Sequence, residues 1–363
     1  MGESELRSWY RLSRLEISPR KVISLLDAFG VPEAIFAAGE ADLCAVDGIN
    51  NRMVEKLLAP EPESLDSELE ALEDRGVRII TIRDPDYPVN LKQIYDPPIV
   101  LYVRGSFRES DRFAVAIVGS RRASIYGRSM AERIAHDLAV RGIAVVSGGA
   151  RGIDSEAHKG ALSAGGRTVA VLGCGIDVDY PPENAELFNR IAESGAVVSE
   201  FPPGSQPEAW RFPGRNRIVS GLALGVLVIQ APSDSGALIT SSYAAEQGRD
   251  VFALPGNVDD MRNEGCHALI RDGAVLVTSA DDILEALGFL TTEERSPQVE
   301  MEMDSLSGNE KKIVGILSLQ PKHVDQIIQE SELSVGDVTS ALTMLEMNGI
   351  VKRVPGNAYV RVL

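Results

Sequence analysis

The run FAVAIVG at residues 113–119 is the first of seven short apolar stretches that decide the fold of this chain. The other six are IAVVSGG (143–149), TVAVLGCG (168–175), AVVSEFP (196–202), GVLVIQAP (225–232), DVFALPG (250–256) and AVLVTS (274–279). Continuous Val, Ile, Leu and Ala runs separated by helical stretches are typical of parallel strands buried on both faces of a sheet. We therefore predict an α/β fold with a Rossmann-like, doubly wound, mostly parallel sheet.

The regions on either side of these runs predict further domains. Residues 1–60 contain short helical segments and resemble a SAM or helix-hairpin-helix domain, for which the acidic surroundings favour a structural role. Two strand-like stretches, VRIITI and IVLYVRG, join the seven runs in an extended Rossmann-like domain over residues 61–290. A polar linker is expected at 291–305. Residues 306–363 have the order of a winged helix, with three amphipathic helices and a hairpin that turns at PGN.

The predicted recognition helix of this winged helix contains Asp337 and Glu346 but no Arg or Lys. A protein that binds duplex DNA depends on Lys and Arg side chains that neutralise the phosphates. We therefore favour a protein-docking or regulatory role for this domain over the reading of duplex DNA.

The composition is that of a folded chain without a membrane anchor. The 363 residues are 44% hydrophobic and 25% charged, and no apolar run reaches the ~18 residues that a membrane-spanning helix needs. The three cysteines lie far apart, with no CxxC pair and no His at metal-ligand spacing. The chain has no GxxxxGK[ST] loop and only a weak GxG at 173–175. We expect a cytoplasmic protein with no membrane partner, no metal and no cofactor.

The charge distribution points to one region where an anion could bind. The net charge of −17 argues against a nucleic-acid partner at first sight. Residues 112–225, however, carry thirteen Lys and Arg against eleven Asp and Glu, and twelve of the thirteen cations are Arg. The planar guanidinium group suits phosphate because it donates two parallel hydrogen bonds.

The loops that follow the predicted strands supply the candidate binding residues, because ligands of doubly wound sheets bind beyond the carboxyl ends of the strands. The candidates are Gly119, Ser120 and Arg121 after the first run, Ser147, Gly148, Arg151 and Gly152 after the second, Arg215, Asn216 and Arg217 in RFPGRNRIVSGL, and Ser235 and Thr240 in SDSGALITSS. Glycines let the backbone approach a phosphate closely, and hydroxyl groups can donate to it.

Structural explanations of the same residues stay open. The glycines could serve tight turns only, and Ser235 could be an ordinary helix N-cap. Arg215 and Arg217 point in different directions on a helix, so one is expected to reach the ligand while the other pairs with a carboxylate. Asp154 is a plausible helix cap. His158 is expected on a helix surface, beside an acid, and no catalytic constellation is evident.

Aromatic side chains near these loops are candidate platforms for stacked bases. The candidates are Tyr126, Tyr180, Phe188, Phe201, Trp210 and Phe212, and at least half of them are expected to lie in the core.

The string of motifs resembles the DprA/Smf DNA-processing proteins of bacteria. The matching stretches are GSRRASIYG (119–127), SGGARGID (147–154), EFPPGSQP (200–207), FPGRNRIVSGL (212–222), SGALITSSYAAEQGRDVFALPG (235–256) and GCHALIRDGA (265–274). The resemblance implies a single-stranded DNA-binding protein that protects incoming strands and loads RecA recombinase onto them in natural transformation. It also implies a homodimer that is not an enzyme.

The resemblance also assigns roles to individual residues. Arg121 matches the motif arginine held to contact DNA, and the segment with Cys266, His267, Leu269 and Ile270 matches the self-association region of relatives. One departure concerns the position after Tyr180-Pro181, where many relatives carry a basic residue and this chain has Pro182 and Glu183. We expect this loss of a cation to weaken DNA affinity.

Two alternatives belong to other functional classes. A nucleotide-binding enzyme of the phosphoribohydrolase type is possible on a similar fold, although the PGGxGTxxE pattern of those enzymes is absent. An interaction adaptor acting through the winged helix is the other alternative.

Overall fold

The computed structural model describes residues 2–289, 306–318, 322–347, 350–354 and 358–361. The chain forms two compact units. The first unit comprises residues 1–122 and 131–283, and the second comprises 123–130 and 284–363. None of the described helices is both long and apolar enough to cross a lipid bilayer.

The first unit begins with short helices whose ends follow from local sequence. They are α1 (Glu3–Ser13), α2 (Pro19–Phe29), α3 (Pro32–Ala37), α4 (Glu40–Cys44), α5 (Asn51–Leu58) and α6 (Leu65–Asp74). Pro19 and Pro32 occupy first helical positions, where the missing N–H costs no hydrogen bond. Gly30 ends α2 with a φ of 85°, a conformation that side chains disfavour.

A nine-stranded sheet forms the centre of this unit. Its strands are β1 (Val77–Thr81), β2 (Val100–Gly105), β3 (Ala114–Val118), β4 (Ala144–Ser147), β5 (Thr168–Val171), β6 (Ala196–Ser199), β7 (Gly225–Val228), β8 (Asp250–Ala253) and β9 (Val275–Leu276). The order is β1-β2-β6-β5-β4-β3-β7-β8-β9. The pairs β1–β2 and β2–β6 are antiparallel, and every later pair is parallel. The predicted α/β class and all nine strand stretches are confirmed.

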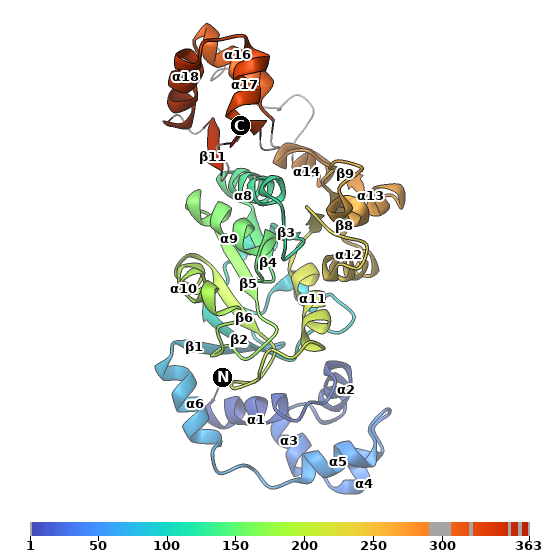
Figure 1. Cartoon of the computed structure of the whole chain (residues 1–363). Helices are drawn as coiled ribbons and strands as arrows, with labels where there is room; N and C mark the ends of the chain where they lie inside the picture. The colour runs from blue at the N-terminus through green and yellow to red at the C-terminus, as the bar shows by residue number, and fades with distance from the viewer. Residues whose placement is uncertain (1, 290–305, 319–321, 348–349, 355–357, 362–363) are drawn as a thin grey trace. The chain divides into compact units, whose positions relative to one another are not determined.

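Helices cover both faces of this sheet (Figure 1). Those that contact its strands include α9 (Ile153–Ser163), α10 (Ala185–Ser194), α11 (Arg211–Leu222), α12 (Gly236–Glu246) and α13 (Glu264–Arg271). The other helices along this part of the chain are α7 (Val89–Lys92), α8 (Ile125–Val140) and α14 (Ala280–Ala286), with 3-10 turns at Glu109–Arg112, Pro182–Asn184 and Met261–Asn263. Val169 and Val171 of β5 face the core that includes α11 and α12, whereas Ala170 and Leu172 face the core that includes α10. This alternation explains why the strand runs are apolar throughout.

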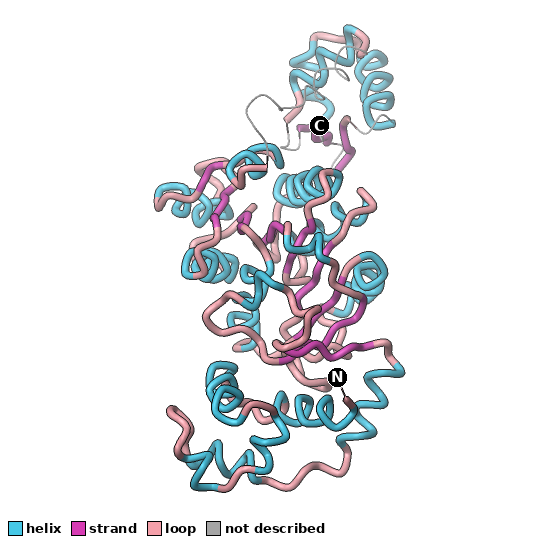
Figure 2. The backbone as a smooth tube through the Cα atoms, turned by 180° about the vertical axis from the view of Figure 1, so that it is seen from behind, coloured by secondary structure: helices cyan, strands magenta, loops and turns pink. Residues whose placement is uncertain are grey.

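The N-terminal helices share a core with one face of the sheet. Trp9 of α1 and Leu25 of α2 are fully buried in the same cluster as Tyr102 and Val197 of the strands. The rings of Tyr10 and Tyr102 meet edge to face at 6.1 Å. The antiparallel strands β1 and β2 lie beside these helices (Figure 2).

The strand order reverses at β3, and this reversal positions the functional site. From β3 the chain continues to β4, β5 and β6 on one side and then returns to β7, β8 and β9 on the other. The loops after β3 and β7 therefore diverge in opposite directions. In open α/β sheets such a switch point leaves a crevice beyond the carboxyl ends of the strands, where ligands bind.

The second unit contains the expected winged helix elements. These are α16 (Gly308–Ile316), α17 (Val324–Ser331), α18 (Val335–Met347) and strands β10 (Lys322–His323), β11 (Val351–Val354) and β12 (Ala358–Arg361), which form a sheet in the order β10-β12-β11. Ser307 and Glu310 form a capping box at the start of α16. Ile313, Leu342 and Leu345 lie in the hydrophobic core of this winged helix. The expected linker at 291–305 and the PGN turn lie outside the described residues.

Candidate functional site

A cavity of about 820 Å³ opens at the switch point, and we call it the strand-end pocket. Loops after β3, β4 and β7 and the N-terminal halves of α11 and α12 form most of its wall, and Tyr180 and Arg262 add to it. Eight of the predicted binding residues lie on its wall: Gly119, Ser120, Arg121, Gly148, Arg215, Asn216, Ser235 and Thr240. The structure thus brings residues of these separate motifs together around one cavity.

Two glycines allow the loops of the pocket to approach one another. A Cβ atom on Gly148 would stand 2.7 Å from Nη2 of Arg215 and 2.8 Å from Oδ2 of Asp154. Gly152 has a φ of 79°, and a Cβ atom there would overlap the backbone carbonyl oxygen of Ser120. Gly152 thus joins the loops after β3 and β4 without itself lining the pocket.

Two buried residues of opposite charge, Arg215 and Asp154, form part of the pocket wall. Arg215 is only 3% exposed, and its Nη1 donates to the carbonyl oxygens of Gly148, at 2.7 Å, and of Val171. Asp154 accepts from the backbone N–H of Ala150 at 3.2 Å. Burial raises the pKa of Asp154 to about 6, although the charge of Arg215 opposes the rise. Burial also lowers the pKa of Arg215 to about 10. Arg215 therefore fixes the loops and places a positive charge beneath them.

Arg121 presents an exposed cation at the pocket. Its guanidinium group lies 5.2 Å from the centroid of the Phe212 ring, within cation–π range. Within the described part of the chain, no carboxylate lies within ion-pair distance of Arg121. Its charge is therefore available to an anion that enters the pocket.

Short polar side chains complete the wall. Ser235 caps α12 by accepting from the backbone N–H of Ala237 at 3.2 Å, so the N-cap interpretation holds for this residue. The Ser120 hydroxyl accepts from the backbone N–H of Arg122 at 3.1 Å. Asn216 donates to the carbonyl oxygen of Gly236 at 3.3 Å. These hydroxyl groups retain the capacity to donate to a ligand.

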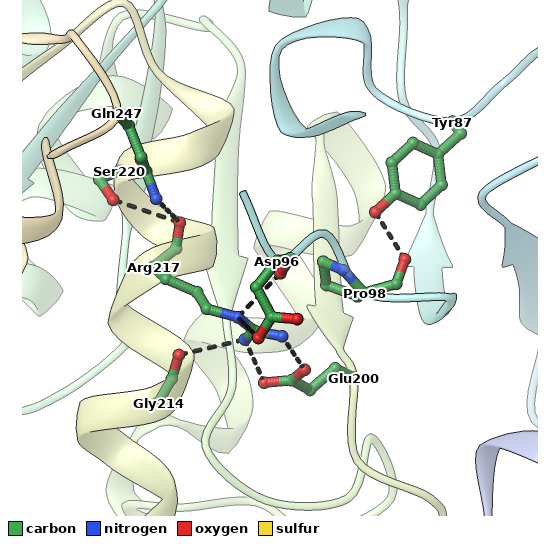
Figure 3. A network of polar contacts seen from close by, with 8 residues as sticks. All are labelled: Tyr87, Asp96, Pro98, Glu200, Gly214, Arg217, Ser220 and Gln247. Carbon is green, nitrogen blue, oxygen red and sulfur yellow. Dashed lines mark hydrogen bonds and ion pairs between the residues drawn. The ribbon is translucent and has the colours of Figure 1, made fainter. Parts of the chain in front are cut away.

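Arg217 belongs to a different environment (Figure 3). Its guanidinium group donates to both carboxylate oxygens of Glu200 at 2.7 Å and to the backbone oxygen of Asp96 at 3.0 Å. The prediction that one arginine of the pair binds a carboxylate is confirmed, and that arginine is Arg217. It is therefore corrected from a binding residue to a structural one, because the spacing from Arg215 turns it to another side of α11.

Ser147 is also corrected to a structural residue. It is fully buried, and its hydroxyl donates to the carbonyl oxygen of Ile117 on the neighbouring strand at 2.6 Å. The residue still lies inside β4, whereas the pocket begins one residue later, at Gly148.

Arg151 lies just outside the strand-end pocket and is occupied by an acid. Its Nη2 donates to Oε2 of Glu183 at 2.9 Å, and its Nε donates to Oε1 of the same carboxylate. The two side chains are 53% and 50% exposed, so solvent screens the pair. The residue that distinguishes this chain after Tyr180-Pro181 is therefore in direct contact with a predicted binding arginine.

Several other predicted positions are buried. His158 is not on a surface: it is fully buried, its Nδ1 lies 2.7 Å from the Thr168 hydroxyl, and burial lowers its pKa to about 3. Cys266, expected in a self-association segment, is also fully buried and contacts the carbonyl oxygen of Val228. Of the six aromatic candidates only Phe188 is fully buried, so fewer lie in the core than expected.

The remaining residues of the self-association segment are only partly buried. Leu269 and Ile270 pack against the core of the sheet. A ring nitrogen of His267 lies 3.0 Å from the carbonyl oxygen of Gly256.

Arg122 and Arg262 also line the pocket and were not among the predicted residues. Arg122 is adjacent to Arg121 in the same motif, which was a usable signal. Arg262 follows β8. Because the carboxyl ends of parallel strands meet at one edge of a sheet, its place near the pocket could also have been predicted from the sequence. Arg262 pairs with Asp260 through an Nε–Oδ1 distance of 2.8 Å. No three His, Cys, Asp or Glu side chains of the described residues gather as a metal ion would require.

The fold and the pocket define the class: a Rossmann-like α/β protein with an arginine-lined pocket where the strand order reverses. A family model described as DNA recombination-mediator protein A matches residues 78–288, and a model of the DprA winged helix domain matches residues 297–357. The chain belongs to the DprA/Smf family.

Individual relatives agree with this membership. Protein Smf of Synechocystis sp. is 36% identical over 99% of this chain and 100% of its own length. Protein Smf of Escherichia coli is 38% identical over 86% of this chain and 85% of its own length.

Two solved structures are similar as well. The crystal structure of DprA from Streptococcus pneumoniae matches with a TM-score of 0.68 and 37% identity, over 77% of this chain and 97% of that one. The structure of DNA processing protein A from Helicobacter pylori, which concerns its single-stranded DNA binding mode, matches with a TM-score of 0.52 and 29% identity. The match covers 58% of this chain and 95% of that one.

Proposed function

We propose that this protein binds single-stranded DNA in the strand-end pocket and acts as a recombination mediator. The observation that carries the proposal is the exposed guanidinium group of Arg121, which has no carboxylate partner among the described residues and lies above loops ordered by Arg215. The Helicobacter pylori relative, whose structure concerns single-stranded DNA binding, supports the choice of ligand.

The pocket chemistry suits a flexible single strand with little sequence preference. Arg121 and the N-terminus of α12 would hold phosphates, which carry no sequence information. Phe212 and Tyr180, with ring centroids 5.6 Å apart, offer aromatic surfaces on which unstacked bases can lie. A duplex keeps its bases stacked and could not use these rings.

We also propose that the protein loads RecA recombinase onto the bound strand, as a cytoplasmic homodimer and without enzymatic turnover. Membership of the family supports this proposal. Self-association would use the partly buried Leu269 and Ile270 with His267. The rate at which RecA assembles on strands covered by a single-strand-binding protein, with and without this protein, tests the RecA role.

Substitution of Arg121→Ala tests the binding site. We expect the affinity for oligo-dT to fall by about tenfold or more, because a charge-assisted phosphate contact is lost. Fluorescence anisotropy of a labelled oligonucleotide at low salt measures the change. Arg78→Ala is the matched control, since Arg78 is an exposed arginine on β1 that does not line the strand-end pocket. Equal affinity of Arg121→Ala and wild type would remove the site assignment.

The same pocket separates this function from the enzymatic alternative. Asp154 is the one carboxylate among the described residues that line the pocket, and it is turned toward the backbone N–H of Ala150. Release of free base from nucleoside monophosphates, followed by chromatography, would favour a phosphoribohydrolase; no release is expected.

A further inference from the structure

A second cavity, of about 760 Å³, lies on the other flank of α11, and we call it the flank pocket. Phe212, Arg215 and Asn216 of α11 line the strand-end pocket, whereas Arg211 and Gly214 line the flank pocket. Residues of the segments 12–19, 96–100 and 200–205, together with Trp210, Arg217 and Tyr243, form the rest of its wall. The two cavities therefore meet around the N-terminal end of one helix.

Trp210 stands at this helix end with an open aromatic surface. It is 62% exposed, although large aromatic side chains are normally mostly buried. Its ring is supported on the inside by Phe201, edge to face at a centroid distance of 6.4 Å. Its indole Nε1 donates to Oε2 of Glu208 at 2.7 Å, which fixes the ring orientation. A rigid, exposed and oriented indole is a platform on which a base can stack.

Arg211 adds a buried positive charge beneath this platform. It is 9% exposed, and its guanidinium carbon lies 5.0 Å from the ring centroids of both Phe201 and Trp210. Its Nε lies 3.4 Å from Oε2 of Glu208, but neither Nε nor Nη1 has a hydrogen-bond partner among the described residues. Two buried guanidinium nitrogens without a hydrogen-bond partner among the described residues are unusual, and they favour an anion nearby.

The backbone adds to this positive potential. Trp210 is the N-cap residue of the 12-residue helix α11, and its side chain does not cap the helix. The helix N-terminus carries partial positive charge, which favours a phosphate. The exposed carboxylate of Glu208 now lies against Trp210 and Arg211, where such a phosphate would lie.

We propose that Trp210 and Arg211 form a second nucleotide subsite for a single DNA strand that leaves the strand-end pocket. One base stacks on the exposed face of Trp210, and the phosphate before it crosses the N-terminus of α11, where it displaces the carboxylate of Glu208 and accepts from the indole N–H in its place. This inference rests on the proposed function. Single-stranded DNA is the occupant because Pro207 and Ala209 still line the strand-end pocket, so the strand reaches Trp210 by crossing one helix end.

Intrinsic fluorescence gives a direct test, because the chain has two tryptophans in contrasting places. Trp9 is fully buried and Trp210 is 62% exposed. We expect an oligo-dT of about 20 nucleotides to quench the emission, and one of about 4 nucleotides, which fills only the strand-end pocket, to leave it unchanged. Trp210→Leu should abolish the quenching, whereas Trp9→Phe should retain it.

Affinity measurements supply the second arm. Trp210→Ala should weaken binding of the longer oligonucleotide by about fivefold or more and leave the shorter one unaffected. Glu208→Gln should strengthen binding of the longer one. Circular dichroism confirms that the variants fold.

The two proposals fail in distinguishable ways. If long oligonucleotides bind in an Arg121-dependent manner but Trp210 is not quenched and Trp210→Ala binds equally well, the second subsite is refuted while the proposed function stands. If no oligonucleotide binds, both are refuted.

Discussion

Asp154 is the residue of the strand-end pocket whose protonation is expected to change near neutral pH. The pKa of Asp154 is raised to about 6, so in the folded protein this carboxyl takes up a proton at a higher pH than in the unfolded chain. The protonated form removes a negative charge from beneath the pocket, next to Arg121 and the loop at Ala150. Bound phosphates raise the pKa further, so DNA binding and protonation favour each other.

We therefore expect the affinity for oligo-dT to rise as the pH falls from about 7.5 to about 5.5, across the pKa of Asp154. His158, whose pKa is lowered to about 3, stays neutral in this window. Asp154→Asn should flatten the profile, and anisotropy titrations at several pH values measure it. An unchanged slope in Asp154→Asn would assign the pH dependence to other groups.

Glu183 limits the positive charge near the pocket, because its carboxylate pairs with Arg151. Glu183→Gln frees Arg151 for a phosphate, and we expect affinity for oligo-dT to rise about two- to fivefold, since exposed ion pairs are weak. Glu186→Gln, the same change at an exposed position in the first turn of α10, is the control. A similar rise in both variants would indicate a general charge effect.

At the scale of elements, the strands of the doubly wound sheet were predictable from the sequence. The orientation of individual side chains was not. Each strand has its own apolar run, and parallel strands must end at one edge, so eight residues from loops and helix starts could be placed together from sequence. Arg217 and Ser147 are on the same motifs, but their partners, Glu200 and the carbonyl of Ile117, come from distant segments that no local pattern identifies.

The glycine that joins the loops after β3 and β4 yields a stability prediction. Gly152→Ala imposes a side chain at a φ of 79° against the Ser120 carbonyl. We expect the free energy of unfolding to fall by about 1–3 kcal/mol, with a lower Tm. Gly214→Ala in α11 is the control, because a Cβ atom there has open space and alanine favours helix. Thermal denaturation compares the two, and equal Tm values would show that the loop relaxes freely.

At the scale of the whole molecule, the proposed function requires an acidic body to bind a polyanion through a local cationic site. The net charge is −17, and the described part of α18 that was expected as a recognition helix includes the acidic Asp337. The family and its winged helix were recognisable from the sequence, because the family motifs lie in the loops and at the strand ends. The shared core of the N-terminal helices and the sheet was not, because Trp9 and Tyr102 are distant in sequence.

A steep salt dependence follows from this charge distribution. We expect the dissociation constant for oligo-dT to rise strongly with salt, because each phosphate contact releases a counterion. Arg121→Ala should reduce the slope of log Kd against log salt by about 0.7 for one lost contact. Identical slopes in the variant and the wild type would show that Arg121 touches no phosphate.

A structure of the complete chain with a short oligo-dT decides whether DNA occupies the switch point of the sheet. We predict a phosphate oxygen within about 3 Å of the Arg121 guanidinium group, with the strand lying over the loops after β3 and β7. A strand bound elsewhere, with the strand-end pocket free of DNA, would contradict the proposed function.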